Sequence, residues 1–179
     1  GYDLAKELCG QAKTGSKSTK AASAPKARAV IPSSLTFFRV QSSFCDNWQN
    51  IVQRELRAIK AKVGFAFGPY GVGEYASELP PLAALVKCVK ALRKDNSPKA
   101  GLRRWLTELH NNGKAAADLM LDRLADVTNE DFDKMDLDAL NEGMAALDQG
   151  LSFSRRQLVS EKGVSPVHDI LSLLAVEGY

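Results

Sequence analysis

Positively charged side chains gather in one stretch of the sequence, from Lys87 to Arg104. This stretch holds seven basic residues against the single acid Asp95, a net charge of +6, whereas the whole chain carries only +3. Lysine and arginine can bind phosphate groups without reading a base sequence. The candidate phosphate-binding residues are Arg93, Lys94, Lys99, Arg103 and Arg104. The alternative interpretation is a solvated charged face that binds no ligand.

Two expected helices position these cations. An apolar row at helical spacing follows the pair Pro80–Pro81 and predicts a helix that ends before Pro98. A second row predicts a helix over residues 99–110, which Asn111, Asn112 and Gly113 end. The cations would therefore surround one end of a helical hairpin. Such a cluster suits proteins that follow the backbone of a single strand.

Other side chains capable of chemistry are few and scattered. His110 and His168 lie far apart and show no zinc-binding spacing, and the acidic run at residues 130–133 lacks the glycine of a calcium loop. Cys9, Cys45 and Cys88 are odd in number and widely separated, so they predict neither a disulfide framework nor a metal site. We expect no enzyme, no metal and no cofactor.

The remaining apolar patterns predict a largely helical chain. A row that begins at Trp48 and includes Leu56 and Ile59 predicts a helix over residues 48–60. The aromatic and glycine-rich residues 63–75 predict two short strands separated by a turn at Gly68–Pro69. Further helices are expected over residues 115–125, 132–150 and 166–176.

The first 34 residues differ in composition from the rest. Residues 2–10 could form a short helix, whereas residues 11–34 are rich in lysine, serine, alanine, glycine and proline and contain no acid. We interpret residues 1–34 as a basic arm and residues 35–179 as one helical domain. The arm has two plausible uses, contact with phosphates or with a neighbouring copy, and the alternative is a flexible tail. The sequence lacks the run of about 20 apolar residues that spans a membrane, and we expect an intracellular protein.

The order of these segments resembles that of the coat proteins of rod-shaped plant viruses of the tobacco mosaic type. The resemblance is carried by IVQREL, by the aromatic segment that follows it, and by LPPLAALVKCVKALRKDN, which together cover about a third of the chain. A weaker second match is SFSRRQL, near the C-terminal end.

This resemblance implies an all-α fold, a four-helix-bundle-type coat protein with a small distal β-hairpin or sheet and an extended terminal arm. The first helix of the bundle would lie at residues 2–10 or at residues 35–47. Arg93 and Lys94 fall where the family's arginines face the RNA, and Arg123 precedes the position of the family's acidic pair, near residues 129–131. The aromatic girdle between subunits would consist of Phe65, Phe67, Tyr70 and Tyr75.

The function implied by the resemblance is a capsid protein that self-assembles helically around single-stranded genomic RNA. Its partners would be further copies of itself and the RNA, without a membrane, and it would be found in the virion and the host cytoplasm. An alternative is a helical-bundle protein-interaction domain of a secreted effector or adaptor. A stable monomer that ignores RNA would favour that alternative.

Overall fold

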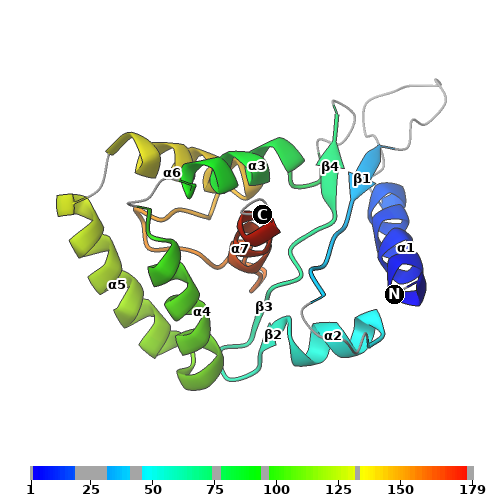
Figure 1. The fold of residues 1–179 in the computed structure, drawn as a ribbon, viewed down its shortest axis with the longest axis horizontal. Helices are drawn as coiled ribbons and strands as arrows, with labels where there is room; N and C mark the ends of the chain where they lie inside the picture. The colour runs from blue at the N-terminus through cyan, green and yellow to red at the C-terminus, as the bar shows by residue number, and fades with distance from the viewer. Residues whose placement is uncertain are drawn as a thin grey trace.

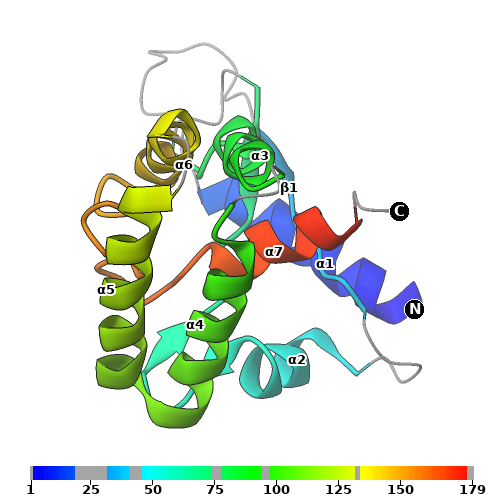
Figure 2. The same ribbon diagram turned by 60° about the vertical axis from the view of Figure 1, so that its left-hand side comes forward.

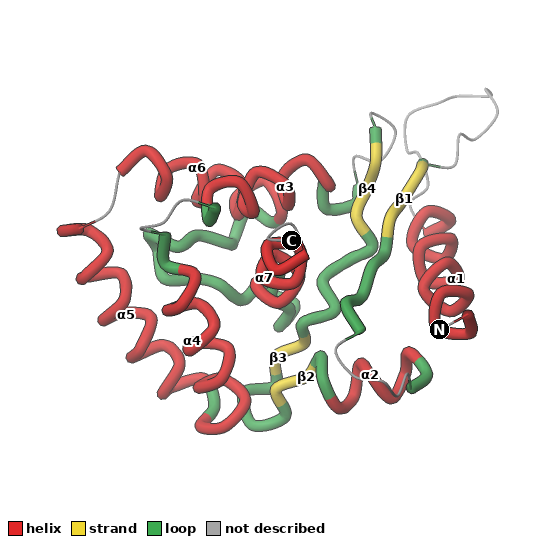
Figure 3. The backbone as a smooth tube through the Cα atoms, in the orientation of Figure 1, coloured by secondary structure: helices red, strands yellow, loops and turns green. Residues whose placement is uncertain are grey.

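The computed structural model describes residues 2–18, 32–40, 46–73, 78–93, 97–131 and 134–176. Within these residues the chain is mostly helical, with two small two-stranded antiparallel sheets (Figures 1 and 3). The helices are α1 (Tyr2–Ser18), α2 (Trp48–Arg54), α3 (Leu82–Ala91), α4 (Lys99–Asn112), α5 (Lys114–Asp131), α6 (Lys134–Leu147) and α7 (Val167–Val176). The strands are β1 (Ser33–Leu35), β2 (Arg57–Ala58), β3 (Val63–Gly64) and β4 (Tyr70–Val72).

Helices α3 and α6 form a closely packed antiparallel pair. Cys88 and Leu140 meet in its middle, where the Cys88 thiol lies 3.9 Å from the Leu140 carbonyl oxygen. The pair can approach this closely because residue 143 is glycine. A Cβ atom on Gly143 would lie 2.5 Å from Cys88 Sγ and 3.1 Å from the Ala84 carbonyl oxygen. Any larger side chain at this position would push the two helices apart.

Helices α4 and α5 form a hairpin and lie side by side in both views (Figures 1 and 2). They are joined at Gly113, whose φ of 86° lies in the region that favours glycine. At the far end of the hairpin, a Cβ atom on Gly101 would lie 2.5 Å from Leu124 Cδ1. The start of α4 therefore rests directly on the second half of α5. This arrangement confirms the predicted helix over residues 99–110 and its end at Gly113.

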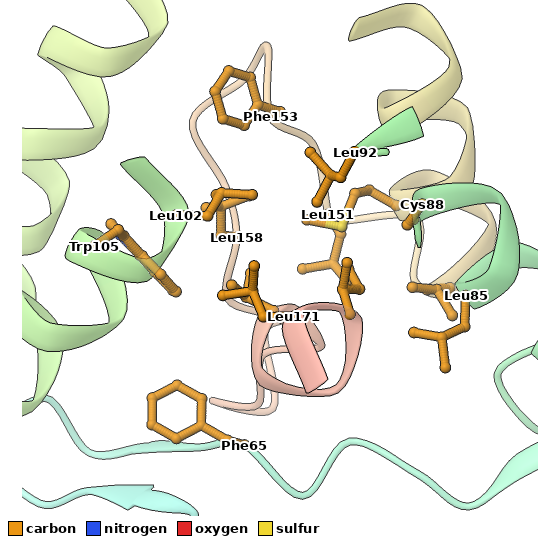
Figure 4. Close-up of a cluster of buried hydrophobic side chains, with 14 of the residues drawn as sticks. Phe65, Leu85, Cys88, Leu92, Leu102, Trp105, Leu151, Phe153, Leu158 and Leu171 are labelled. Atoms are coloured by element: carbon orange, nitrogen blue, oxygen red, sulfur yellow. The ribbon is translucent and has the colours of Figure 1, made fainter. Parts of the chain in front are cut away.

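The core lies where α7 packs against α3 and α4. Figure 4 shows Trp105 entering it from α4, Leu85 and Cys88 from α3, and Leu158 from the segment that precedes α7. All four side chains are at most 1% exposed. Burying a large apolar side chain contributes about 1.5–3 kcal/mol, so this cluster, rather than any single helix, holds the fold together.

The two predicted strands within residues 63–75 exist, but they do not form a hairpin with each other. Strand β3 pairs with β2, and β4 pairs with β1 through Leu35 opposite Tyr70. The other edge of β3 is also occupied, because Gly64 donates a backbone hydrogen bond to Gly163 and accepts one from Ser165. Both edges of β3 are therefore occupied by other segments. Of the two expectations, a hairpin within residues 63–75 is wrong, whereas a small sheet is present as two separate two-stranded sheets.

The helix predicted over residues 48–60 is also wrong beyond Arg54. Asn47 caps α2 by accepting a hydrogen bond from the Asn50 N–H, and α2 then spans only Trp48–Arg54. Ala58 pairs with Val63, and Ile59 is 75% exposed in the turn between them. Cross-strand hydrogen bonds replace the helical ones here, so the apolar spacing that includes Ile59 did not mark a buried face.

Helix α1 is longer than the short helix predicted over residues 2–10, and it docks on the domain. The Ser16 hydroxyl donates to Ser34 Oγ over 2.6 Å, and Ser34 Oγ donates to the Ala12 carbonyl oxygen over 2.7 Å. Near the other end of α1, Leu4 is buried. Of the two positions considered for a first helix, residues 2–10 are helical. Leu35 ends strand β1, residues 36–40 form no helix or strand, and residues 41–45 lie outside the described part of the chain.

Candidate nucleic-acid interface

The turn between α3 and α4 brings the predicted phosphate-binding cations together at one end of the helix pairs. Arg93 follows Leu92, the residue that caps the C-terminal end of α3, and Lys99 is the first residue of α4. Arg103 and Arg104 lie one turn further along α4 and are exposed, as Arg93 is. We call Arg93, Lys99, Arg103 and Arg104 the basic turn. Lys94, the fifth predicted member, lies outside the described residues.

The backbone adds to the positive potential of the basic turn. Pro98 precedes α4 without a side-chain cap, and no acid occupies the first turn of the helix. The first backbone bond of the helix runs from the Leu102 N–H to the Pro98 carbonyl oxygen, so the earlier amide groups point outward. Helix N-termini carry about half a positive charge and favour anions. Cations and helix dipole therefore act in the same direction at this end.

The acids of the neighbouring helix bind a different arginine. Arg156 Nη1 lies 3.1 Å from Asp122 Oδ1 on α5, and Arg156 Nη2 also binds Asp126. Among the described residues, no ion pair involves Lys99, Arg103 or Arg104. The last two arginines therefore present their charge to solvent. The role of Arg156 was not predicted from the sequence, although Asp122 and Asp126 stand four residues apart, the spacing of one helix face.

Arg123, the sixth predicted RNA-binding residue, lies on α5 beside the start of α4. It is exposed, and its neighbour Leu124 lies against Gly101 in the first turn of α4. The fold thus places Arg123 at the same end of the α4–α5 hairpin as the basic turn. The side chains of residues 129–131, the expected position of an acidic pair, lie outside the described residues.

The predicted interface aromatics lie mostly inside the subunit. Phe65 and Tyr70 are 0% and 1% exposed, and Phe67 is half-buried with its ring 6.3 Å from that of Tyr70. Phe65 and Tyr70 therefore offer no ring surface to a neighbouring copy, because the core of their own chain uses it. Tyr75 lies outside the described residues.

Tyr70 and the cation Arg93 nevertheless lie at opposite ends of α3. Strand β4, which begins at Tyr70, lies beside the N-terminal end of α3, where the Gly71 N–H donates to the Pro80 carbonyl oxygen over 2.9 Å. Arg93 follows the other end of the helix (Figure 1). A helix of this length extends about 15 Å. Tyr70 and Arg93 are therefore separated by the length of α3.

A second polar cluster is buried near α7. The Tyr70 hydroxyl donates to Asp169 Oδ2 over 2.6 Å, and burial, together with this carboxylate, raises the pKa of Tyr70. His168 Nδ1 lies 3.7 Å from Asp169 Oδ1. These residues line a cavity of about 20 Å³, which has room for about one water molecule. It is too small for a substrate.

The two histidines converge on one aromatic ring rather than on a cleft. The ring centroid of Phe65 lies 5.0 Å from that of His110 and 6.4 Å from that of His168. Burial, and secondarily His168, lowers the pKa of His110. Across the described ranges, no three histidine, cysteine or acidic side chains are grouped so that they could hold a metal ion. No helix in the described part is long and apolar enough to cross a membrane.

Comparison with known proteins finds no matching family, no similar characterised protein and no similar solved structure.

Proposed function

We propose that this chain is a capsid subunit of the rod-shaped plant virus type, which self-assembles helically and packages single-stranded RNA along the basic turn. The observation that carries the proposal is the pair of exposed arginines, Arg103 and Arg104, beside the uncapped start of α4. Because the acids Asp122 and Asp126 bind Arg156, they leave this pair available to phosphates.

The order of elements also supports the proposal. Helices α3 and α6 form one packed pair and α4 and α5 form another. The two pairs lie across each other rather than along one axis (Figures 1 and 2), so the four-helix bundle of the coat-protein type stays a prediction from the resemblance. Strand β4, paired with β1, lies beside the end of α3 that is opposite the cations (Figure 1). In a rod, each subunit would point its basic turn toward the RNA near the rod axis. Since Phe65 and Tyr70 belong to the core, lateral contacts between subunits would use other surfaces.

The basic turn is tested with Arg103→Gln combined with Arg104→Gln. Each lysine or arginine that contacts a phosphate of a single strand contributes about 0.7 to the slope of log K against log salt. The double variant is therefore expected to lower this slope by about 1.4. Affinity for a labelled oligo-uridylate, measured over a series of salt concentrations, gives the slope.

The matched control is Arg54→Gln combined with Arg57→Gln. Both arginines are exposed on α2 and β2, away from the basic turn, and the pair makes the same change in charge. An unchanged slope in the Arg103 and Arg104 variant, or an equal loss in the control, would contradict the assignment.

Self-assembly is tested separately by negative-stain electron microscopy of the chain mixed with single-stranded RNA. Rods or stacked discs are expected. Monomers alone, across a range of pH and salt and with no RNA binding, would instead favour the protein-interaction domain of an effector or adaptor.

A further inference from the structure

A groove lies between α1 and β1, outside the basic turn. Its volume is about 590 Å³, within the range of sites that bind small ligands. One wall of the groove comes from residues 9–17 of α1, and the other comes from Pro32 and strand β1. The lining includes Lys13, Lys17, Ser33, Cys9, Ala12 and Pro32, and it contains no carboxylate.

The groove is held open in a fixed shape. Two consecutive hydrogen bonds, from Ser16 to Ser34 and from Ser34 to the Ala12 carbonyl oxygen, join α1 to β1 at its floor. Ser16 is only 6% exposed, so the hydrogen bonds are shielded from solvent. The walls are therefore positioned before any ligand arrives, which lowers the entropic cost of binding.

The charge of the groove comes from two lysines that no acid neutralises. Lys13 and Lys17 stand four residues apart, on one face of α1. Both are exposed, and neither has an ion pair or hydrogen bond among the described residues. The acids of α1, Asp3 and Glu7, lie in its first half, and Glu7 accepts the Trp48 N–H. The two lysines repel each other unless an anion lies between or beside them.

We propose that this groove binds the phosphodiester backbone of a single-stranded nucleic acid. Lysine side chains are hydrogen-bond donors only, and phosphate oxygens are acceptors only. A peptide strand would also bring N–H donors, for which the charged groups here offer no acceptor. Lys13 and Lys17 have Cβ atoms about 5–6 Å apart, so they can bind neighbouring phosphates on one strand. Ala12 and Pro32 provide an apolar surface for a sugar or base.

The groove is separate from the basic turn. Helix α1 and strand β1 lie on the other side of the strand region from the α4–α5 hairpin (Figure 1). The groove would give the chain a second contact with single-stranded nucleic acid, the ligand of the proposed function. The observations that support this contact come from the groove alone. The two proposals can fail independently.

Cys9 provides a reporter inside the groove. It is exposed, whereas Cys88 is buried, and burial raises the pKa of Cys88 to about 12. Thiolates react with N-ethylmaleimide, so Cys9 is expected to react and Cys88 to remain unmodified in the folded chain. Peptide mapping by mass spectrometry measures the modification of Cys9 separately from that of the other cysteines. The experiment measures its rate in the full chain with and without a 20-nucleotide oligo-uridylate.

Protection of Cys9 is the expected result. At a strand concentration about ten times the Kd, the rate should fall by about tenfold, because mass action leaves only about one chain in eleven unbound. Lys13→Gln with Lys17→Gln should remove the protection. The control Lys62→Gln with Lys162→Gln changes the same charge at exposed positions outside both sites and should retain it.

Three outcomes would overturn the inference. One is an unprotected Cys9 when the strand saturates the chain, and another is undiminished protection in the Lys13 and Lys17 variant. The third is equal protection by polyglutamate or by inorganic phosphate at the same concentration of charged groups, which would assign the groove to acidic protein or to free phosphate. Protection that survives Arg103→Gln with Arg104→Gln would support the groove even where the basic turn fails.

Discussion

Two polar regions of this molecule use their charged groups in opposite ways. Near α7, the Tyr70 hydroxyl and the Asp169 carboxylate lie 2.6 Å apart, and both residues are less than a tenth exposed. At the basic turn, Arg103 and Arg104 extend into solvent without an ion pair among the described residues. The polar groups of the first region bind each other, whereas Arg103 and Arg104 of the second present hydrogen-bond donors to solvent.

The comparison shows why these regions should respond to different perturbations. Removing one member of a buried pair leaves the other desolvated and without a partner, which costs folding free energy. Removing an exposed charge costs almost nothing in folding but removes an attraction for a ligand. Substitutions in the polar cluster near α7 should therefore lower stability, whereas substitutions at the basic turn should lower binding.

Tyr70→Phe is expected to have the largest effect on stability. The change leaves the Asp169 carboxylate buried without its hydrogen-bond donor, and we expect a loss of about 2 kcal/mol in the free energy of unfolding. Urea denaturation measures it. The matched control is Tyr2→Phe, because Tyr2 is 82% exposed, and its expected change is below about 0.5 kcal/mol. Equal values for the two variants would remove the distinction between buried and exposed polar groups.

Acidification is expected to have an intermediate effect, through His110. Its pKa is lowered in the folded chain, mainly by burial and then by His168, so the unfolded chain binds the proton more readily. Stability from this group is full above about pH 6.5, the unfolded value, and is lost as the pH falls toward the folded value. Urea denaturation at about pH 7.5 and at about pH 5.5 measures the free energy of unfolding before and after this loss. Most carboxylates stay ionised at both pH values.

The control for acidification is His110→Gln, which cannot bind the proton. Its free energy of unfolding should depend less on pH over the same window than that of the unchanged chain. If both proteins lose stability equally on acidification, another group is responsible, and the contact between His110 and Phe65 has no part in it.

Arg103→Gln with Arg104→Gln is expected to have the smallest effect on stability, although it tests the proposed RNA contact. Exposed substitutions away from caps and buried pairs usually change the free energy of unfolding by less than about 0.5 kcal/mol. Urea denaturation of the same double variant used for the salt series measures this. A loss above about 1 kcal/mol would show that these arginines hold the fold, and any loss of RNA binding would then be indirect.

The sequence predicted the elements that depend on local pattern. The apolar rows of α3, α4 and α7 gave helices close to the observed ones, since their spacing follows the helical repeat over ten or more residues. Gly113 ended α4 as expected. The clustering of Arg93, Lys99, Arg103 and Arg104 also followed from the sequence, because two helices and one turn suffice to bring them together.

Long-range pairing was not predictable in the same way. No pattern near β3 in the sequence indicates that residues 163–165 bind the edge of β3 opposite β2. Because that edge is occupied, β4 does not pair with β3, and it pairs with β1 instead. Likewise, Arg156 reaches Asp122 and Asp126 from thirty or more residues away. Such contacts depend on which surfaces the finished core brings together.

By itself, the sequence determined the helical character, the chain's polarity of charge and the position of the basic turn, because hydrophobic spacing and charge act over neighbouring residues. Only the tertiary structure decided that Phe65 and Tyr70 are buried and that α1 folds back to form a groove with β1. The physical reason is that burial depends on which surfaces remain uncovered after packing. An aromatic residue has the same local pattern whether it meets its own core or another copy of the chain.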